Sequence, residues 1–329
     1  MLNKDLKLNE KLFEETVEQK AVRDGFGDAL VELGEKNPNV VVLTADLTES
    51  TRCQDFKNKF PERFFEVGVA EQNMAAIAAG LGVSGKTAFI SSYAAFSPGK
   101  NWETIKTTIV YNNANVKIAG HHAGIVTGPD GVTHQATEDI SLMRSLPNLT
   151  IFVPCDYVEA KKVTLEAANI NSPVYLRFSR EKSPIITTND TPFEKNKIQA
   201  FWMSDNPRAT IFATGHMLFY ALLAAKNLES EGINVLVANV STIKPIDQES
   251  VIELTKNSGK VVTVEDHQAA GGMGSVIAEV LAQTTPHPIE FIGLMNSFAE
   301  SGDPKELLDK YKMDEKAIEE AVKKVIQRG

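Results

Sequence analysis

The sequence predicts an α/β protein built from two doubly wound, mostly parallel-sheet domains. Short runs rich in Val, Ile, Leu and Phe alternate with helical patterns, and this alternation occurs in two series along the chain. Near-continuous apolar runs are typical of parallel strands that are covered on both faces. Strand–helix alternation at this spacing implies right-handed crossovers, so each series is expected to form one sheet with helices on both sides.

The first series spans the amino-terminal half of the chain. Its apolar runs, such as "NVVVLTAD" and "KTAFISS", predict strands at 39–46, 63–68, 86–92, 116–122, 149–154 and 173–178. The intervening patterns predict helices at about 22–36, 71–82, 100–111, 137–145 and 156–168. These elements are assigned to a first domain at 19–185.

A break separates the two series. Residues 181–200, "EKSPIITTNDTPFEKNKIQA", show no clear period and are rich in Pro, Thr, Asn and Lys, which predicts a linker, set at 186–199. The second domain is placed at 200–329, with strands at 209–215, 234–240, 260–266 and 288–294 and a last helix at about 313–327. The two domains share a pattern but no clear sequence repeat.

Composition excludes several classes of protein. The chain has 329 residues, 43% of them hydrophobic, and a formal net charge of −9, so it lacks the basic surface expected of a nucleic-acid-binding protein. No apolar run reaches the ~18 residues of a membrane helix, and the charged amino terminus is no signal peptide. Cys53 and Cys155 stand in no metal-ligand spacing, and two cysteines in a chain of this length indicate a reducing, cytoplasmic setting.

Polar residues follow the predicted strands of the first domain. Ligands of open α/β sheets bind beyond the carboxyl ends of strands, so these positions are the candidates for a site. They are Asp46, Ser50, Glu71, Tyr93, Phe96, His121, His122, Asp130, His134 and Arg180. Three of the six histidines lie between residues 121 and 134 in a segment rich in glycine, which favours a functional loop over a structural one.

Glu71 opens the otherwise uncharged stretch "EQNMAAIAAG" and allows two interpretations. An acidic side chain in the first turn of a helix interacts favourably with the helix dipole. Alternatively, Glu71 is a catalytic acid held in a dry pocket, where low polarity favours the protonated carboxyl group. The residues around Glu71 leave both interpretations open.

Two motifs of the second domain are given structural interpretations. "GGMGSV" contains half of a dinucleotide-binding fingerprint, but the full spacing is absent, so we interpret these glycines as a tight turn into a helix. "STIKPID" is interpreted as a strand exit, a proline turn and the N-cap of the next helix.

The ordered set of motifs resembles the carboxyl-terminal half of transketolases. The motifs are "ADLTES", "GVAEQNM", "SSYAAF", "GPDGVTHQATEDISLMRSLPN", "LRFSR", "TIKPID" and "VEDHQAAGGMGS". The resemblance runs from about Gln19 to the end of the chain and is most similar to split transketolases, in which two polypeptides share one enzyme. It implies a pyrimidine-binding domain at 19–185 and a transketolase C-terminal domain at 200–329.

The resemblance implies thiamine diphosphate as the cofactor. Glu71 matches the glutamate that hydrogen-bonds N1′ of the aminopyrimidine ring and so promotes removal of the thiazolium C2 proton. To donate that hydrogen bond, Glu71 must be protonated near neutrality. Phe96 resembles the aromatic residue that stacks on the pyrimidine, Tyr93 lies beside the same pocket, and Asp46 matches an acid near the cofactor.

The resemblance also implies the substrates, which are a ketose phosphate donor and an aldose phosphate acceptor of the pentose phosphate pathway. Arg23, Ser50, His122 and Arg180 match the residues that grip the sugar phosphate. Asp130 matches the group that contacts the C2 hydroxyl of the acceptor. His134, the second catalytic candidate, matches a histidine near the C1 and C3 hydroxyls of the donor.

The family holds the diphosphate and its metal ion, Mg²⁺ or else Ca²⁺ or Mn²⁺, with a Gly-Asp-Gly motif, and "GDG" does not occur here. The resemblance therefore implies no metal ligand in this chain, an amino-terminal partner subunit that carries the motif, and self-association in an α2β2 assembly. One alternative is a subunit like those of 1-deoxy-D-xylulose-5-phosphate synthase or the 2-oxo acid dehydrogenase β chain. Another is a non-catalytic interaction module, which loss of Glu71 or His134 would favour.

Overall fold

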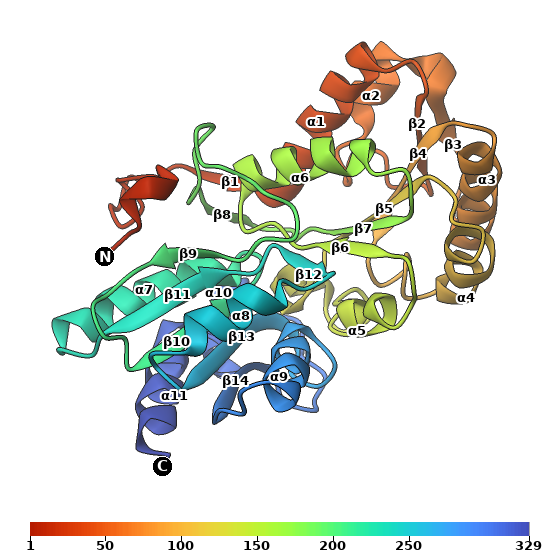
Figure 1. Ribbon diagram of the computed structural model, residues 1–329. Coiled ribbons are helices and arrows are strands. Elements are labelled where there is room, and N and C mark those ends of the chain that lie inside the picture. Colours follow the sequence, from red (N-terminus) through yellow and green to blue (C-terminus); the bar gives the residue numbers. More distant parts are fainter. Residues whose placement is uncertain (329) are drawn as a thin grey trace.

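The computed structural model describes residues 1–328 and contains two main sheets (Figure 1). The first has seven strands in the order β12-β6-β7-β5-β4-β2-β3. They are β2 (Val40–Thr44), β3 (Phe64–Glu66), β4 (Thr87–Tyr93), β5 (Val116–His121), β6 (Thr150–Phe152), β7 (Val174–Arg177) and β12 (Thr242–Lys244). All neighbours pair in parallel except β12, which is antiparallel to β6. The doubly wound fold and its six predicted strands are confirmed.

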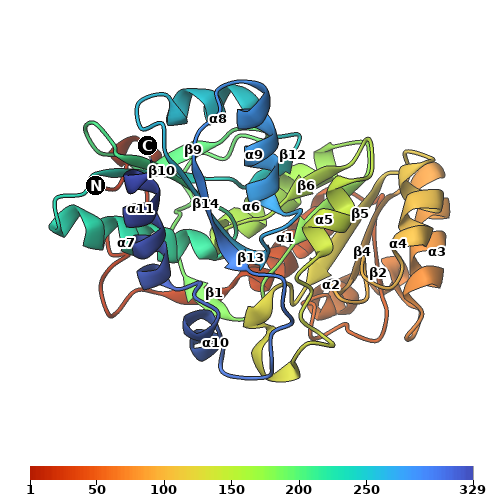
Figure 2. The ribbon, with the colours of Figure 1, turned by 90° about the horizontal axis from the view of Figure 1, so that it is seen from below.

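Helices cover both faces of the first sheet (Figures 1 and 2). One face carries α1 (Val22–Lys36), α2 (Gln54–Lys59) and α6 (Tyr157–Asn169), with buried Phe26, Phe89 and Phe152 between them and the strands. The other carries α3 (Glu71–Val83), α5 (Asp139–Arg144) and α4 (Trp102–Thr104), which continues as the π-helix η3 (Ile105–Val110). The 3₁₀ turns η2 (Pro61–Arg63) and η4 (Ile125–Asp130) lie in the connections.

The second sheet has five strands in the order β14-β13-β10-β11-β9. They are β9 (Gln199–Trp202), β10 (Ala209–Ala213), β11 (Val235–Asn239), β13 (Val261–Gln268) and β14 (Ile289–Leu294), of which β9 is antiparallel to β11. The apolar clusters place α7 (Met217–Ser230), α10 (Pro304–Lys310) and α11 (Glu315–Gln327) on one side. They place α8 (Gln248–Thr255) and α9 (Met273–Gln283) on the other.

The two halves interlock more closely than the sequence predicts. The segment "STIKPID" supplies β12, a strand of the first sheet, before Asp247 caps α8 by accepting the Ser250 N–H. One apolar cluster runs from Ile105 in the first half to Ile277 in the second without interruption. Within 181–200, β8 (Lys182–Pro184) pairs with β1 (Gln19–Ala21), so this segment is not a structureless connection.

The first 18 residues pack on the second sheet, not the first. They include η1 (Lys4–Leu6), and both Leu8 and Leu12 are buried in the cluster beneath α7. The Asn3 N–H donates to the Phe201 carbonyl over 2.8 Å, and the Asn9 N–H donates to the Ile186 carbonyl over 2.9 Å. The amino terminus therefore bridges the two halves of the chain.

The glycines of "GGMGSV" form a turn into α9, as predicted. Gly271 has φ of +84°, and both carboxylate oxygens of Glu265 accept backbone N–H groups from Met273 and Gly274, over 2.7 and 2.8 Å. A Cβ atom on Gly272 would lie 2.1 Å from Glu265 Oε2, so a side chain is excluded there. The glycines let a buried carboxylate cap this helix.

Lys117 is a buried cation in the middle of β5. Its side chain is fully buried, and Nζ donates to the carbonyls of Ile170 and Ser172, the latter over 2.7 Å. Burial lowers the pKa of Lys117 to about 7. Between about pH 7 and the ordinary lysine pKa, the unfolded chain therefore binds more protons at this residue than the folded chain, and stability rises with pH.

We predict that Lys117→Met stabilises the protein at pH 7 and flattens this pH dependence. In the native chain, Lys117 is expected to contribute a rise in unfolding free energy of about 1–2 kcal/mol between pH 7 and pH 9, from the slope of up to about 1.4 kcal/mol per pH unit per proton. Urea unfolding at both pH values measures it. The control is Lys256→Met, an exposed lysine. An unchanged slope in Lys117→Met would show that Lys117 is not the titrating group.

Candidate active site

The predicted site residues gather at the carboxyl edge of the first sheet. Asp46 and Ser50 follow β2, Tyr93 ends β4 and precedes Phe96, His122 follows β5, and Arg180 follows β7. Arg23 joins them from the first turn of α1. Since β2, β4, β5 and β7 are parallel neighbours, their ends meet at one edge, which is the arrangement predicted from the sequence.

Four side chains form one connected cluster at this edge. Arg23 Nη1 donates to the Ser50 carbonyl over 2.8 Å and lies 3.3 Å from His122 Nε2. The Ser50 hydroxyl lies 2.7 Å from the Tyr93 hydroxyl, and the Tyr93 and His122 rings stack with centroids 3.8 Å apart. The cluster presents guanidinium, hydroxyl and imidazole groups together, which suits an anionic ligand.

His122 is held as a neutral ring. Burial lowers its pKa to about 3, helped by the charges of Arg23 and Arg180. Because Arg23 occupies Nε2 as a donor, the ring proton resides on Nδ1. Nδ1 is buried and has no hydrogen-bond partner within residues 1–328, so this N–H is an unsatisfied buried donor of the cluster.

Arg180 and His134 are tied to this cluster through the loop that contains η4. Arg180 Nη1 donates to the Thr127 carbonyl over 2.9 Å, and the Thr127 hydroxyl donates to the His122 carbonyl over 2.5 Å. The half-buried His134 ring packs edge-on against Phe96, with centroids 5.3 Å apart. Asp130 ends η4 and is exposed.

Glu71 is both the first residue of α3 and a buried carboxylate. Its side chain is 2% exposed, and Oε2 lies 3.1 Å from Lys100 Nζ. Its backbone carbonyl accepts a hydrogen bond from the buried Asn101 side chain over 3.0 Å. The sequence analysis considered only the uncharged stretch that follows Glu71. It missed Lys100, because this lysine lies 29 residues away in a different loop.

Tyr93 and Phe96 form an aromatic wall near Glu71. Their rings are stacked with centroids 5.9 Å apart, and both side chains are partly exposed. The turn after β4 that carries them continues directly into Lys100 and Asn101, the two residues that contact Glu71. The turn that carries this flat apolar surface therefore also contacts the buried carboxylate at the start of α3, a combination that fits a heteroaromatic ligand whose ring nitrogen meets an acid.

Glu66 organises the loop that carries Asp46, and sequence reasoning missed it. Its carboxylate accepts hydrogen bonds from the Asp46 and Gly68 N–H groups and from the hydroxyls of Thr44 and Thr48, over 2.6–3.0 Å. Asp46 itself has φ of +62°, in the left-handed region. An open cleft of about 620 Å³ is lined by Asp46, Ser50 and Arg23. The sequence did contain a signal for Glu66, because this acidic residue stands at the end of a predicted strand, in "FFEVG".

The second domain holds the histidine loop in place. On β13, Asp266 Oδ1 accepts the Ile125 N–H over 2.8 Å, while Oδ2 lies 3.4 Å from the Val126 N–H. Two residues further on, the Gln268 N–H donates to the Thr137 carbonyl over 2.7 Å. The loop between His122 and Thr137 is thus fixed near both ends by one strand of the other sheet, which no local pattern could reveal.

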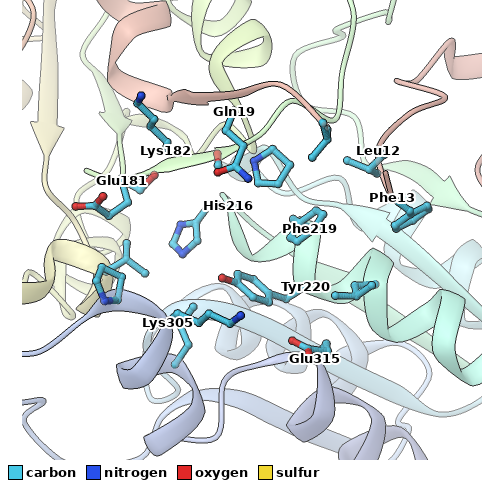
Figure 3. A pocket seen from close by; sticks show the side chains of 18 of the residues that line it. Leu12, Phe13, Gln19, Glu181, Lys182, His216, Phe219, Tyr220, Lys305 and Glu315 are labelled. Carbon is cyan, nitrogen blue, oxygen red and sulfur yellow. The ribbon is translucent and has the colours of Figure 1, made fainter. Parts of the chain in front are cut away.

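A second cavity, of about 560 Å³, lies away from these residues (Figure 3). The amino-terminal segment, the start of α7 and the region of α10 line it, with the His216 ring inside. Burial lowers the pKa of His216, and its Nε2 lies 3.6 Å from Asp266 Oδ2. None of the predicted site residues lines this cavity.

Among residues 1–328, no three His, Cys, Asp or Glu side chains are placed to hold a metal ion together. None of the described helices combines the length and apolar character needed to cross a membrane.

Comparison with known proteins agrees with the fold. Residues 18–185 match the family described as transketolase, pyrimidine binding domain, and residues 199–318 match the transketolase C-terminal domain. A chain with this pair of domains is an α/β protein with a pyrimidine-binding domain. More narrowly, this chain belongs to the transketolase family.

Relatives and a solved structure span nearly the whole chain. A putative transketolase C-terminal section from Methanocaldococcus jannaschii is 43% identical over 91% of this chain and 94% of its own length. A 6-deoxy-6-sulfo-D-fructose transketolase subunit from a Clostridium species is 35% identical over 96% and 98%. The structure titled split gene transketolase, inactive beta4 tetramer, is 43% identical, with a TM-score of 0.86 over 93% of this chain and 98% of that one.

We predict that Asp266→Asn loosens the histidine loop without unfolding the second domain. Hydrogen bonds to charged groups contribute roughly 1.5–3 kcal/mol, so loss of the carboxylate charge is expected to cost about that much. Hydrogen exchange at the Ile125 and Val126 amides is expected to quicken. The matched control is Asp314→Asn, which removes a carboxylate that caps α11 away from the loop. Equal exchange at Ile125 in both variants would contradict the role given to Asp266.

Proposed function

We propose that this chain is the carboxyl-terminal subunit of a split, thiamine-diphosphate-dependent transketolase. The enzyme would transfer a two-carbon ketol unit from a ketose phosphate to an aldose phosphate, as in the pentose phosphate pathway. The observation that carries the proposal is the buried Glu71 carboxylate, held by the turn that also carries the stacked Tyr93 and Phe96 rings. The Arg23 cluster lies at the same sheet edge. One edge thus offers a place for a heteroaromatic ring and a place for an anion.

The residues near Glu71 fit the pyrimidine half of thiamine diphosphate. Glu71 would share a hydrogen bond with the ring nitrogen, the Tyr93–Phe96 wall would pack on the ring face, and Asp46 would lie near the cofactor. When bound, the cofactor supplies the carbanion chemistry that carries the two-carbon unit. The buried position of Glu71 would keep water from its carboxyl group, which strengthens this contact.

The Arg23 cluster fits the sugar phosphate. Arg23 and Arg180 would supply charge, Ser50 a hydroxyl, and neutral His122 an imidazole ring whose Nδ1–H is not satisfied within residues 1–328. Asp130, exposed at the end of η4, would contact the C2 hydroxyl of the acceptor. His134 would exchange protons with hydroxyl groups of the ketose donor, since its ring packs against Phe96 in the proposed cofactor site.

The anion bound by the cluster need not be a phosphate. The Clostridium relative is described as a transketolase subunit for a sulfonated sugar. A sulfonate, like a phosphate, presents several oxygens to a guanidinium fork, so Arg23 and Arg180 fit either group. A 6-sulfo ketose is therefore a second candidate donor.

The proposal places the diphosphate, its Mg²⁺ (or Ca²⁺ or Mn²⁺) and the Gly-Asp-Gly motif on an amino-terminal partner subunit, within an α2β2 assembly. Support comes from α3, whose exposed face carries Ala76, Ile77, Gly80 and Val83 and lacks charge. An uncharged, partly apolar helix face suits burial against another subunit. The solved relative is itself titled an inactive β4 tetramer. We place the assembly in the cytoplasm, since Cys53 and Cys155 are both free and buried.

We predict that the isolated chain shows no ketol transfer and that an amino-terminal transketolase subunit restores it. The assay is transfer from xylulose 5-phosphate to ribose 5-phosphate with thiamine diphosphate and Mg²⁺, and the partner subunit alone is the control. Full activity of the isolated chain would refute the split enzyme. A complex that instead condenses pyruvate with glyceraldehyde 3-phosphate would show a synthase.

We predict that Arg180→Ala in the reconstituted complex raises KM for ribose 5-phosphate about 10- to 150-fold, from a charge-assisted contact of roughly 1.5–3 kcal/mol. KM for glycolaldehyde, which has no phosphate, is expected to change little. The control is Arg208→Ala, at the start of the second sheet. Equal losses with both acceptors would remove Arg180 from the phosphate site and leave the transketolase assignment intact.

A further inference from the structure

Lys100 covers the carboxylate that the proposed cofactor must reach. Its Nζ lies 3.1 Å from Glu71 Oε2, and the two side chains differ sharply in exposure, at 48% for Lys100 and 2% for Glu71. Glu71 is therefore shut off from solvent, with an ammonium group at its carboxylate and the lysine stem running to the surface. The ring nitrogen of the proposed cofactor would therefore have to replace this ammonium group to contact Glu71 Oε2.

The turn after β4 fixes Glu71 and leaves Lys100 free to move. Asn101, 1% exposed, donates to the Glu71 carbonyl and holds the start of α3 against the turn. The Lys100 backbone is anchored by its N–H, which donates to the Phe96 carbonyl over 3.1 Å. The Lys100 side chain, in contrast, has four methylene groups and a half-exposed path to water.

A buried charge without a partner is strongly unfavourable, so the pair with Lys100 stabilises the cofactor-free chain. Lys100 Nζ contacts Glu71 at Oε2. A ring nitrogen that shares a hydrogen atom with this oxygen would have to displace the ammonium group. Lys100 and the ring are thus competitors for Glu71.

We propose that Lys100 is a positioning residue that occupies Glu71 in the cofactor-free chain and swings into solvent when the pyrimidine ring of thiamine diphosphate takes its place. This inference rests on the proposed function. The free energy needed to open the site is then the free energy needed to break the Lys100–Glu71 pair. Apparent affinity for the cofactor is then reduced by the fraction of chains in which Lys100 is still closed over Glu71.

The test compares Lys100→Met with the matched control Lys106→Met, an exposed lysine six residues further along that does not pair with Glu71. In the complex with the amino-terminal subunit and Mg²⁺, calorimetric titration with thiamine diphosphate is expected to give a Kd about tenfold lower for Lys100→Met than for wild type. Lys106→Met is expected to match wild type. A Kd for Lys100→Met that is unchanged or higher overturns the proposal.

Thermal unfolding of the isolated chain gives a second, cofactor-independent readout. Lys100→Met is expected to melt roughly 2–6 °C lower, because Glu71 loses its partner, and adding Glu71→Gln is expected to recover most of that loss. If the two changes are additive, the pair is not coupled and the proposal fails. A wild-type complex that binds no thiamine diphosphate, with the coupling intact, would instead refute the proposed function, and the competition with it.

Discussion

The arrangement of the candidate site depends on one carboxylate that crosses from the second domain into the first. Asp266, at 1% exposure, accepts the Ile125 N–H at the point where the chain leaves β5 and enters η4. The Asp266 carbonyl is held in turn by Arg177 Nη2 over 2.7 Å, and Arg177 pairs with Asp139 over 2.8 Å. A buried ionic network therefore joins β13 to β7 and α5. Through Asp266, this network holds the start of the loop that carries Asp130 and His134 against the second sheet.

The site itself divides into two regions that share residues of one loop system. Glu71, Phe96 and Lys100 lie where β4 ends, whereas Arg23, Ser50 and Arg180 surround His122. Tyr93 belongs to both, since its ring stacks on His122 and on Phe96 while its hydroxyl meets Ser50. A displacement of the Tyr93 ring would therefore change side-chain contacts in both regions. Tyr93 therefore links the two regions of the candidate site.

Much of the fold could be predicted from sequence because its signals are local. The continuous apolar runs of β2, β4 and β5 identify buried parallel strands, and α1 occupies the predicted 22–36. The clustering of Ser50, Tyr93 and His122 followed from the rule that strand ends meet, whereas Arg23 was assigned to the site only through the resemblance to transketolases. The contacts of Lys100, Glu66 and Asp266 could not be predicted in the same way, because each depends on residues brought together by the tertiary fold. β12 was missed for a similar reason, since it joins the first sheet only through its pairing with β6, about ninety residues earlier in the chain.

That strand has a consequence for how the chain acquires its structure during synthesis. β6 pairs with β7 on one side and with β12 on the other, yet β12 is made about ninety residues later. Until Thr242–Lys244 has left the ribosome, the outer edge of β6 presents unpaired N–H and carbonyl groups, which can pair with another nascent chain. The first sheet therefore completes its edge only after β11 has been made. A truncated protein that ends in the 186–199 segment would carry an open edge and is expected to aggregate.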